Sequence, residues 1–288
     1  MTVLGAVALP RIPPEHLAAV GDAAEESGLD ELWLWEDCFW GGGVAAAATV
    51  LARTERVRVG IGVMPVPLRN VALTAMEVAS LLRLHPGRFL PGFGHGVQEW
   101  MAQVGACAES PMTLLREQFG ALRGLLCGRT VTTSGRYVQL DKVALDWPPT
   151  APVPMLAAAS GPRTLRLSGE LADGTILTSR TAPDGVRAAR ALIDEGRARA
   201  GRTEPHRVIV YVATATGPDA DRRLAATAEQ HGFQAGAGIA GDPDSIADTV
   251  RRYTAAGADT VVLEPTDDDP NPVEFVRFVG EKVRPLLD

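Results

Sequence analysis

The sequence predicts an α/β protein, a (β/α)8 TIM barrel built as a single domain with loop insertions. Short apolar runs alternate with longer segments of helical pattern along the whole chain. Several helical segments begin with Pro near the first turn and end at Gly, as helices prefer. Such alternation indicates parallel strands joined by crossovers, and eight units favour a closed barrel over an open sheet. The predicted domain spans residues 1–288.

Each expected element follows in chain order. The strands are predicted at Val3–Leu9, Glu31–Trp35, Val57–Val63, Arg88–Gly92, Val153–Ala158, Gly174–Leu177, Val208–Ala213 and Thr260–Glu264. The helices are predicted at Pro14–Ser27, Gly43–Thr54, Val71–Leu84, Pro111–Cys127, Pro162–Ala172, Pro183–Ala200, Pro243–Ala256 and Pro272–Leu286.

Two stretches are longer than this repeat requires. The first, Gly128–Thr150, contains a predicted hairpin with strands at Thr130–Thr133 and Tyr137–Leu140. The second, Thr216–Asp242, is long for one connection and ends in a flexible, glycine-rich run. Loops of this length in barrel enzymes are typically lids or subunit contacts.

The composition excludes several classes of protein. Hydrophobic residues make up 46% and charged residues 22%, an ordinary globular balance. A net charge of −7 argues against a nucleic-acid partner. The three cysteines form no CxxC pair, so neither a disulfide framework nor a thiolate metal site is indicated. With no signal peptide and no apolar run long enough to span a bilayer, we expect a cytoplasmic protein.

The residues that follow the predicted strands indicate the chemistry, because barrel active sites form at the carboxyl ends of the strands. These positions hold many glycines and aromatic residues but few general acids and bases. They are Trp35–Trp40, Gly62–Pro65, Gly92–Gly96, Ala159–Pro162, Ser179–Arg180 and Glu264–Pro265. This collection suits a flat aromatic cofactor better than a hydrolytic triad. No GxSxG or HExxH motif occurs, and the histidines lack metal-ligand spacing, so no metal site is expected.

The run Gly92-Phe93-Gly94-His95-Gly96 differs from a dinucleotide fingerprint, which needs GxGxxG spacing. We interpret it as a turn that lets a ring or phosphate approach the backbone; the alternative is a glycine-rich loop without a ligand. His95 is the histidine at a strand exit. It contacts the ligand in one interpretation and is structural in the other.

Glu36 and Asp37 are adjacent acids in an aromatic and apolar segment. Partial desolvation beside tryptophans raises the pKa of a carboxyl and suits proton transfer. The alternative is a loop acid that caps the helix Gly43–Thr54. Ser160 precedes another predicted helix, where it is either an N-cap or, with Gly161, part of an anion site.

Several segments, in this order, resemble the luciferase-like monooxygenase superfamily, which includes bacterial luciferase and the deazaflavin (coenzyme F420) dependent oxidoreductases. The resemblance covers nearly the whole chain. It rests on Gly28–Asp37, Arg56–Val63, Arg69-Asn70, Pro86–Phe89, Gly92–Gly96, Ala159–Pro162, Ala172–Gly174 and Gly257–Leu263.

The resemblance implies a TIM barrel, usually dimeric, with a flavin or deazaflavin at the carboxyl ends of the strands. It implies that the bond matching the family's non-prolyl cis peptide is Gly62–Val63. It also implies that the amides of Ser160 and Gly161 hold the cofactor phosphate. The expected cofactor-binding residues are Gly62, Val63, Gly94, His95, Gly96, Ala159, Ser160 and Gly161.

The sequence also departs from the family pattern. Where the deazaflavin sugar-phosphate dehydrogenases carry a catalytic His and a Glu, Asp37 and Val97 stand here. The compact chain is more similar to the deazaflavin reductases, so F420 is favoured over FMN. We expect hydride transfer from F420 to a small organic substrate, with Asp37 or Glu36, together with His95, placing or supplying the proton. The alternatives are an FMN-dependent monooxygenase and a non-catalytic flavin-binding barrel.

Overall fold

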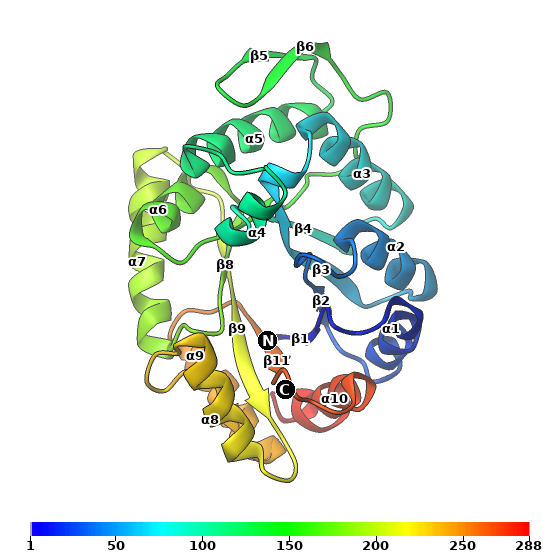
Figure 1. Cartoon of the computed structure of the whole chain (residues 1–288), viewed down its shortest axis with the longest axis vertical. Coiled ribbons are helices and arrows are strands. Elements are labelled where there is room, and N and C mark those ends of the chain that lie inside the picture. The colour runs from blue at the N-terminus through cyan, green and yellow to red at the C-terminus, as the bar shows by residue number, and fades with distance from the viewer. Residues whose placement is uncertain (1, 288) are drawn as a thin grey trace.

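All eight predicted strands form, and they close into one barrel. A computed structural model describes residues 2–287, so residues 1 and 288 of the predicted domain lie outside the described part. The barrel strands are β1 (Val3–Ala8), β2 (Glu31–Leu34), β3 (Arg58–Pro65), β4 (Phe89–Gly94), β7 (Leu156–Ala158), β8 (Gly174–Leu177), β9 (Arg207–Ala215) and β11 (Thr260–Pro265). Figure 1 shows them at the centre of a ring of helices.

The barrel closes because both ends of the strand order find partners. Every ladder in it is parallel, from β11 through β1, β2, β3, β4 and β7 to β8. β9 pairs with both β8 and β11, which completes the circle. Parallel strands of this kind need a covering layer, and the helices supply it. The predicted (β/α)8 fold is therefore confirmed.

The connecting helices also form where the sequence predicted them, except that the first helix begins later and the last helix ends earlier than predicted. They are α1 (Leu17–Glu26), α2 (Gly43–Arg53), α3 (Val71–Leu84), α5 (Pro111–Leu126), α6 (Pro162–Leu171), α7 (Pro183–Arg199), α9 (Pro243–Ala255) and α10 (Pro272–Phe278). Residues Pro14–His16 form a short 3-10 turn before α1 rather than its first turn.

The last helix is not one continuous α-helix to Leu286, as the sequence predicted. After α10 the chain continues as a π-helical turn at Val279–Val283 and a 3-10 turn at Arg284–Leu287. Gly280 and Pro285 lie in this stretch, and both are poor residues for the interior of an α-helix.

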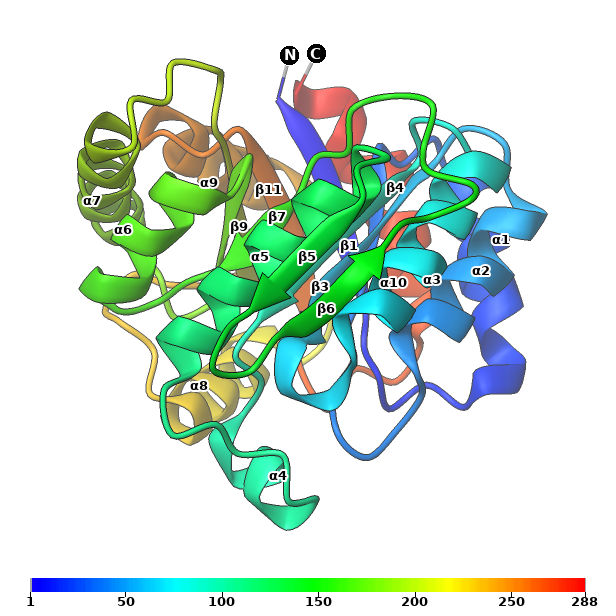
Figure 2. The ribbon, with the colours of Figure 1, turned by 90° about the horizontal axis from the view of Figure 1, so that it is seen from above.

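The first predicted insertion forms as expected. β5 (Val131–Ser134) and β6 (Gln139–Val143) make an antiparallel hairpin, one to three residues from the predicted bounds. The hairpin lies outside the barrel beside α5, as Figure 2 shows. A helix that the sequence did not predict, α4 (Gln98–Gln103), follows β4.

The second predicted insertion, Thr216–Asp242, is not a flexible loop. It contains the helix α8 (Ala220–His231) and the two-residue strand β10 (Ile239–Ala240), which pairs with β9. In its glycine-rich end, Gly236 and Gly238 adopt positive φ. Its weak apolar pattern explains the miss, because Thr227 is the buried residue of α8.

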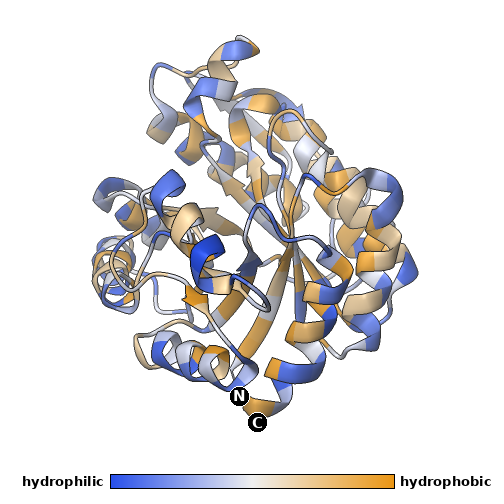
Figure 3. Cartoon of the chain, turned by 60° about the horizontal axis from the view of Figure 1, so that its bottom comes forward, coloured by the Kyte–Doolittle hydropathy of each residue, from blue (hydrophilic) through white to orange (hydrophobic). Residues whose placement is uncertain are grey.

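Ion pairs between side chains lie at the amino-terminal end of the barrel. Inside it, fully buried Glu31 accepts hydrogen bonds from Arg207 at 2.5 Å and from the Trp33 indole at 3.1 Å, and pairs with Arg58 at 2.9 Å. Figure 3 shows the strands in hydrophobic colours and the outer faces of the helices largely in hydrophilic ones. A charge buried among apolar strands persists when it is paired in this way.

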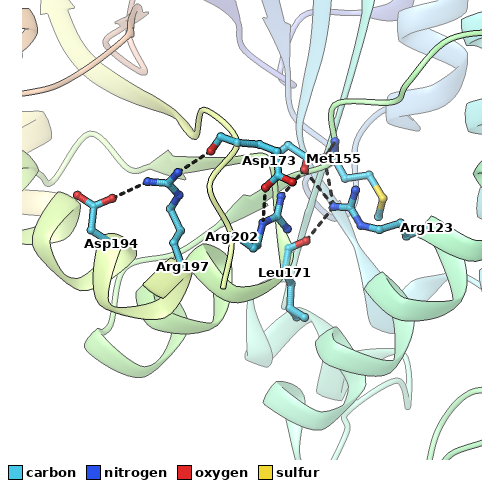
Figure 4. A network of polar contacts seen from close by, with 8 residues as sticks. Arg123, Met155, Leu171, Asp173, Asp194, Arg197 and Arg202 are labelled. Carbon is cyan, nitrogen blue, oxygen red and sulfur yellow. Dashed lines mark hydrogen bonds and ion pairs between the residues drawn. The ribbon is translucent and has the colours of Figure 1, made fainter. Parts of the chain in front are cut away.

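A second polar network lies at the same end, around Asp173 just before β8 (Figure 4). Its carboxylate accepts the Met155 amide at 2.9 Å and pairs with Arg123 at 3.2 Å and with Arg202 at 2.6 Å. These contacts join the starts of β7 and β8 to α5, through Arg123, and to the loop after α7, through Arg202. Figure 2 shows the beginning of β1 at one end of the barrel and α4 at the opposite end. The carboxyl ends of the strands therefore form an open mouth beneath α4.

Candidate active site

Two adjoining cavities occupy the mouth of the barrel. The inner cavity has a volume of about 270 Å³ and the outer cavity about 440 Å³. The residues that line both are Asp37, Gly62, Val97, Trp100, Thr178 and Tyr211. Because they share these lining residues, the two cavities lie next to each other at the carboxyl ends of the strands.

Most residues proposed from the sequence meet at the inner cavity. Its lining includes Glu36, Asp37, Gly62, Val63, Gly94, His95, Gly96, Ala159 and Ser160. Gly161 follows Ser160 but does not line this space. These residues lie at the ends of four strands, β2, β3, β4 and β7, and Glu36 and Ser160, which are 124 residues apart in the chain, thus border one surface, as expected for a parallel barrel.

Glycines keep one wall of the inner cavity flat. A Cβ atom at Gly94 would lie 2.7 Å from Cγ2 of Val63 and 3.5 Å from the Ala158 side chain. A Cβ atom at Gly62 would lie 1.9 Å from the Tyr211 hydroxyl. The Gly62–Val63 peptide bond is cis, in agreement with the resemblance, and so is Cys38–Phe39. Protein side chains thus fill the space beside each glycine, and the backbone of Gly62, Val63 and Gly94 borders the cavity, where a planar ring can approach it closely.

Asp37 is the free carboxylate of the site. Its side chain is half-buried, faces both cavities, and makes no hydrogen bond or ion pair within residues 2–287. Burial raises the pKa of Asp37 from its ordinary value to about 6. A carboxyl that titrates near neutral pH in a cavity can exchange a proton with a bound molecule.

Glu36 is held as a structural group instead. Its Oε2 accepts the backbone N–H of Gly43 at 2.7 Å, and both carboxylate oxygens accept hydrogen bonds from Arg69 at 3.0 and 2.7 Å. Arg69 in turn pairs with Glu77 on α3 at 2.6 Å. The capping interpretation therefore describes Glu36 better than a free acid at the reaction centre does.

His95 lies at the exit of β4, where the sequence placed it. Burial lowers the pKa of His95, and the backbone of Pro111 opposes that shift. The Nδ1 atom is buried and has no hydrogen-bond partner within residues 2–287. His95 is therefore a neutral imidazole at neutral pH that borders the inner cavity.

The start of α6 does not agree with the interpretation of Ser160 as its N-cap. Its N-cap is Gly161 rather than Ser160, and no side chain caps it. Ser160 is exposed and lines the inner cavity together with Thr164. The first backbone N–H groups of α6 thus have no side-chain acceptor at the cavity rim, an arrangement compatible with an anion.

Four large aromatic side chains line the outer cavity: Trp35, Trp40, Trp100 and Tyr211. Sequence reasoning placed two of them in the strand-end segment Trp35–Trp40 and missed Trp100 and Tyr211. The Trp35 and Tyr211 rings lie 5.6 Å apart, and burial raises the pKa of Tyr211 well above its ordinary value. Strand alternation gives the signal that was missed, because every second residue of β9 faces the barrel interior.

Glu264, near the end of β11, was noted as a strand-end residue but given no role. It lines the outer cavity and is only 8% exposed. Alternation with buried Val262 places it on the interior face. Within residues 2–287, no cluster of three or more His, Cys, Asp or Glu side chains is placed to bind a metal ion. Over the same residues, no helix has both the length and the apolar character needed to cross a bilayer.

Comparison with known proteins places the chain among flavin and deazaflavin enzymes. The model of the luciferase-like monooxygenase family matches residues 2–235. The 5,10-methylenetetrahydromethanopterin reductase of Methanolobus tindarius is 31% identical over 252 residues, 87% of this chain and 76% of the relative. An F420-dependent glucose-6-phosphate dehydrogenase of Microbacterium testaceum is 28% identical and covers 95% of this chain and 94% of its own length.

Solved structures share the fold over the whole chain. An F420-dependent secondary alcohol dehydrogenase, in complex with an F420-acetone adduct, has a TM-score of 0.89 at 20% identity and covers 100% of this chain and 99% of its own. The oxygenating constituent of 3,6-diketocamphane monooxygenase from Pseudomonas putida, in complex with FMN, has a TM-score of 0.79 at 16% identity, with coverage of 99% and 98%.

Proposed function

This chain belongs to the luciferase-like monooxygenase family, and we propose that it transfers a hydride from coenzyme F420 to a small organic substrate. One observation carries the proposal: a backbone cradle for a planar ring and an unpartnered carboxyl meet in the same cavity. Two relatives support the choice of cofactor. One is named as an F420-dependent dehydrogenase, and the other is named as a methylenetetrahydromethanopterin reductase.

Backbone groups would hold the cofactor. Gly62, Val63 and Gly94 present the flat wall on which the ring would lie, and Gly96 (φ +67°) turns the chain away from it. The start of α6, at Ser160, would receive the phosphate. When bound, a reduced deazaflavin supplies the hydride, while the protein contributes orientation and exclusion of water.

The side chains divide the remaining work. Asp37 places or supplies the proton that accompanies the hydride, because it borders both cavities and has no other partner. Glu36 positions Asp37 by fixing the loop through Gly43 and Arg69. His95, a neutral imidazole, offers a hydrogen bond at the inner cavity.

Cofactor binding to the purified protein tests the proposal directly. We expect saturable binding of F420 in the micromolar range, measured by fluorescence titration, and much weaker binding of FMN. Gly94→Ala should weaken F420 binding about tenfold, because its Cβ atom crowds Val63 on the ring-binding wall. Gly120→Ala on the exposed side of α5, where a Cβ atom meets nothing within 4 Å, is the matched control.

An FMN-dependent monooxygenase is the second candidate, favoured by the FMN-bound structure that shares this fold. FMN binding without F420 binding, together with substrate-dependent oxygen consumption, would replace our proposal with this one. A non-catalytic barrel is the third candidate. If F420 binds but Asp37→Asn and His95→Ala leave turnover of an identified substrate unchanged, the proton-handling roles assigned above are wrong.

We further propose that the chain is one barrel domain that forms a cytoplasmic homodimer. The outer face of α3 supports the dimer, since Leu73, Met76 and Leu84 are 47%, 58% and 71% exposed at helical spacing. Three free cysteines suit a reducing compartment.

A further inference from the structure

The outer cavity contains a second carboxyl group that the proposed function does not use. Glu264 is 92% buried, and its Oε2 atom has no hydrogen-bond partner in the described chain. An isolated buried carboxylate is costly, whereas a protonated carboxyl is tolerated and is a hydrogen-bond donor. Burial raises the pKa of Glu264 to about 8, the Ser179 side chain opposes the shift, and the charges of Asp267 and Asp37 add to it.

The charged groups around Glu264 do not neutralise it. Arg11 pairs with Asp267 at 3.1 Å and lies over the Trp40 ring at 5.6 Å. His231 on α8 also faces Asp267, at 3.4 Å. The other titratable or charged groups that line this cavity are Asp37, Arg180 and Tyr211. No ion pair to Glu264 forms within residues 2–287, so the carboxyl keeps its proton near neutral pH.

Position separates Asp37 and Glu264, the two acids of the mouth for which no ion pair forms within residues 2–287. Asp37 lines both cavities, whereas Glu264 lines the outer cavity only. The flat backbone wall that suits a ring belongs to the inner cavity. A molecule in the outer cavity is therefore bordered by Glu264 and also by Asp37 and Gly62, which border the inner cavity as well.

We propose that Glu264 is the acid that protonates the heteroatom of the substrate, and that the outer cavity accepts uncharged planar compounds with a C=N or C=O group. This proposal rests on the proposed function. The walls of Trp35, Trp40 and Trp100 suit a flat, apolar or aromatic body. The carboxyl hydrogen of Glu264 selects a hydrogen-bond acceptor and gives no such contact to an isolated C=C bond.

The chemical step balances with this assignment. A hydride adds to the carbon of the C=N or C=O group, and the π electrons move to nitrogen or oxygen. That atom forms its new N–H or O–H bond with the Glu264 proton, leaving Glu264 as a carboxylate that regains a proton from water at the mouth. The substrate gains two electrons and two hydrogens, and the reduced deazaflavin is oxidised. Asp37, with the lower pKa of the two, then orients the substrate as an acceptor.

The protonation state can be measured in cofactor-free protein. Infrared difference spectra between about pH 6 and pH 10 should contain the C=O band of a protonated carboxylic acid that disappears with a midpoint near 8. Glu264→Gln should remove this band, while Glu281→Gln, which changes an exposed residue of the π-helical turn Val279–Val283, should keep it. A band with a midpoint near 8 that survives in Glu264→Gln overturns the proposal, whereas a band with a midpoint near 6 belongs to Asp37.

Isoquinoline probes the proton transfer itself, because its ultraviolet spectrum changes when the ring nitrogen is protonated. At pH 7 we expect saturable binding with the spectrum of a protonated or strongly hydrogen-bonded ring. Above the pKa of Glu264 the free-base spectrum should return and the affinity should fall about tenfold.

Variants show which residue causes the spectral change of isoquinoline. Glu264→Gln should bind isoquinoline as the free base at every pH, whereas Glu281→Gln should behave as the unmodified protein. No saturable binding at pH 7, or a spectral change that follows Asp37→Asn and persists in Glu264→Gln, overturns the proposal. Neither measurement needs a cofactor, so a failure here is distinguishable from a failure of F420 to bind.

Discussion

At the scale of single residues, the mouth of the barrel depends on pairs in which one small residue makes room for a large one. Gly62 on β3 and Tyr211 on β9 are the tightest such pair. The tyrosine hydroxyl lies 3.4 Å from the Gly62 carbonyl and occupies the position that a Cβ atom at Gly62 would need. The glycine is therefore required by a side chain 149 residues away.

Gly62→Ala is expected to lower the free energy of unfolding by about 1–3 kcal/mol, because the new methyl group collides with the Tyr211 hydroxyl. Adding Tyr211→Phe should recover part of the loss, since the nearest ring carbon is 3.2 Å from the added Cβ atom. Urea denaturation of the two single variants and the double variant measures this coupling. Additive losses would contradict the contact.

Glu264 gives a prediction about stability and pH. Its pKa is about 8 in the folded protein and near the ordinary 4.5 when unfolded. Between these values the folded state binds a proton that the unfolded state has released, so unfolding free energy falls as pH rises. We expect Glu264→Gln to remove a slope of roughly 1 kcal/mol per pH unit across this window. Equal slopes in urea titrations of both proteins would refute the elevated pKa.

At the scale of elements, two glycines let α6 and α7 pack with their backbones in contact. A Cβ atom at Gly196 would lie 2.0 Å from the Arg166 carbonyl oxygen, and one at Gly169 would lie 2.1 Å from the Ile193 carbonyl oxygen. These helices cover β7 and β8, which carry the Ala158 to Thr178 side of the inner cavity. The close packing of α6 and α7 thus helps to hold β7 and β8, and with them this side of the inner cavity, in position.

Gly196→Ala should destabilise the protein by roughly 1–3 kcal/mol, because backbone atoms rather than a flexible side chain stand in the way. Gly120→Ala makes the same chemical change on α5 in open space. It should stabilise the protein by about 0.5–1 kcal/mol through higher helix propensity. Thermal unfolding of both variants distinguishes them, and shifts of the same sign would count against the packing argument.

At the scale of the whole molecule, the exposed apolar stripe on α3 gives the homodimer its test. Met76→Glu places a charge at the centre of the stripe and should convert dimers to monomers in sedimentation velocity. Val104→Glu changes another exposed apolar residue, beyond α4, and should leave the dimer intact. If the unmodified protein is monomeric, or if dimers persist in Met76→Glu, the exposed face of α3 is not a dimer interface.

Much of the architecture was readable from local pattern. The eight strands, the hairpin and most helix bounds follow from apolar runs punctuated by Pro and Gly, and the strand-end rule brought Asp37, Gly62, Gly94 and Ser160 to one place. α4 and α8 were missed because their burial is slight: Met101 and Thr227 are their buried residues. A helix that hides so little leaves almost no periodic signal.

The sequence by itself determined the barrel, its mouth and the kind of surface found there, because strand periodicity and glycine placement act over a few residues. Only the tertiary structure decided which of these two neighbouring acids, Glu36 and Asp37, lacks a polar partner, since Arg69 and the Gly43 backbone N–H both reach the Glu36 carboxylate and not that of Asp37. It also decided that Glu264 keeps a proton, because burial and the charges of Asp37 and Asp267 come from segments that no local pattern connects. Electrostatic environment depends on distance in space, and folding sets that distance.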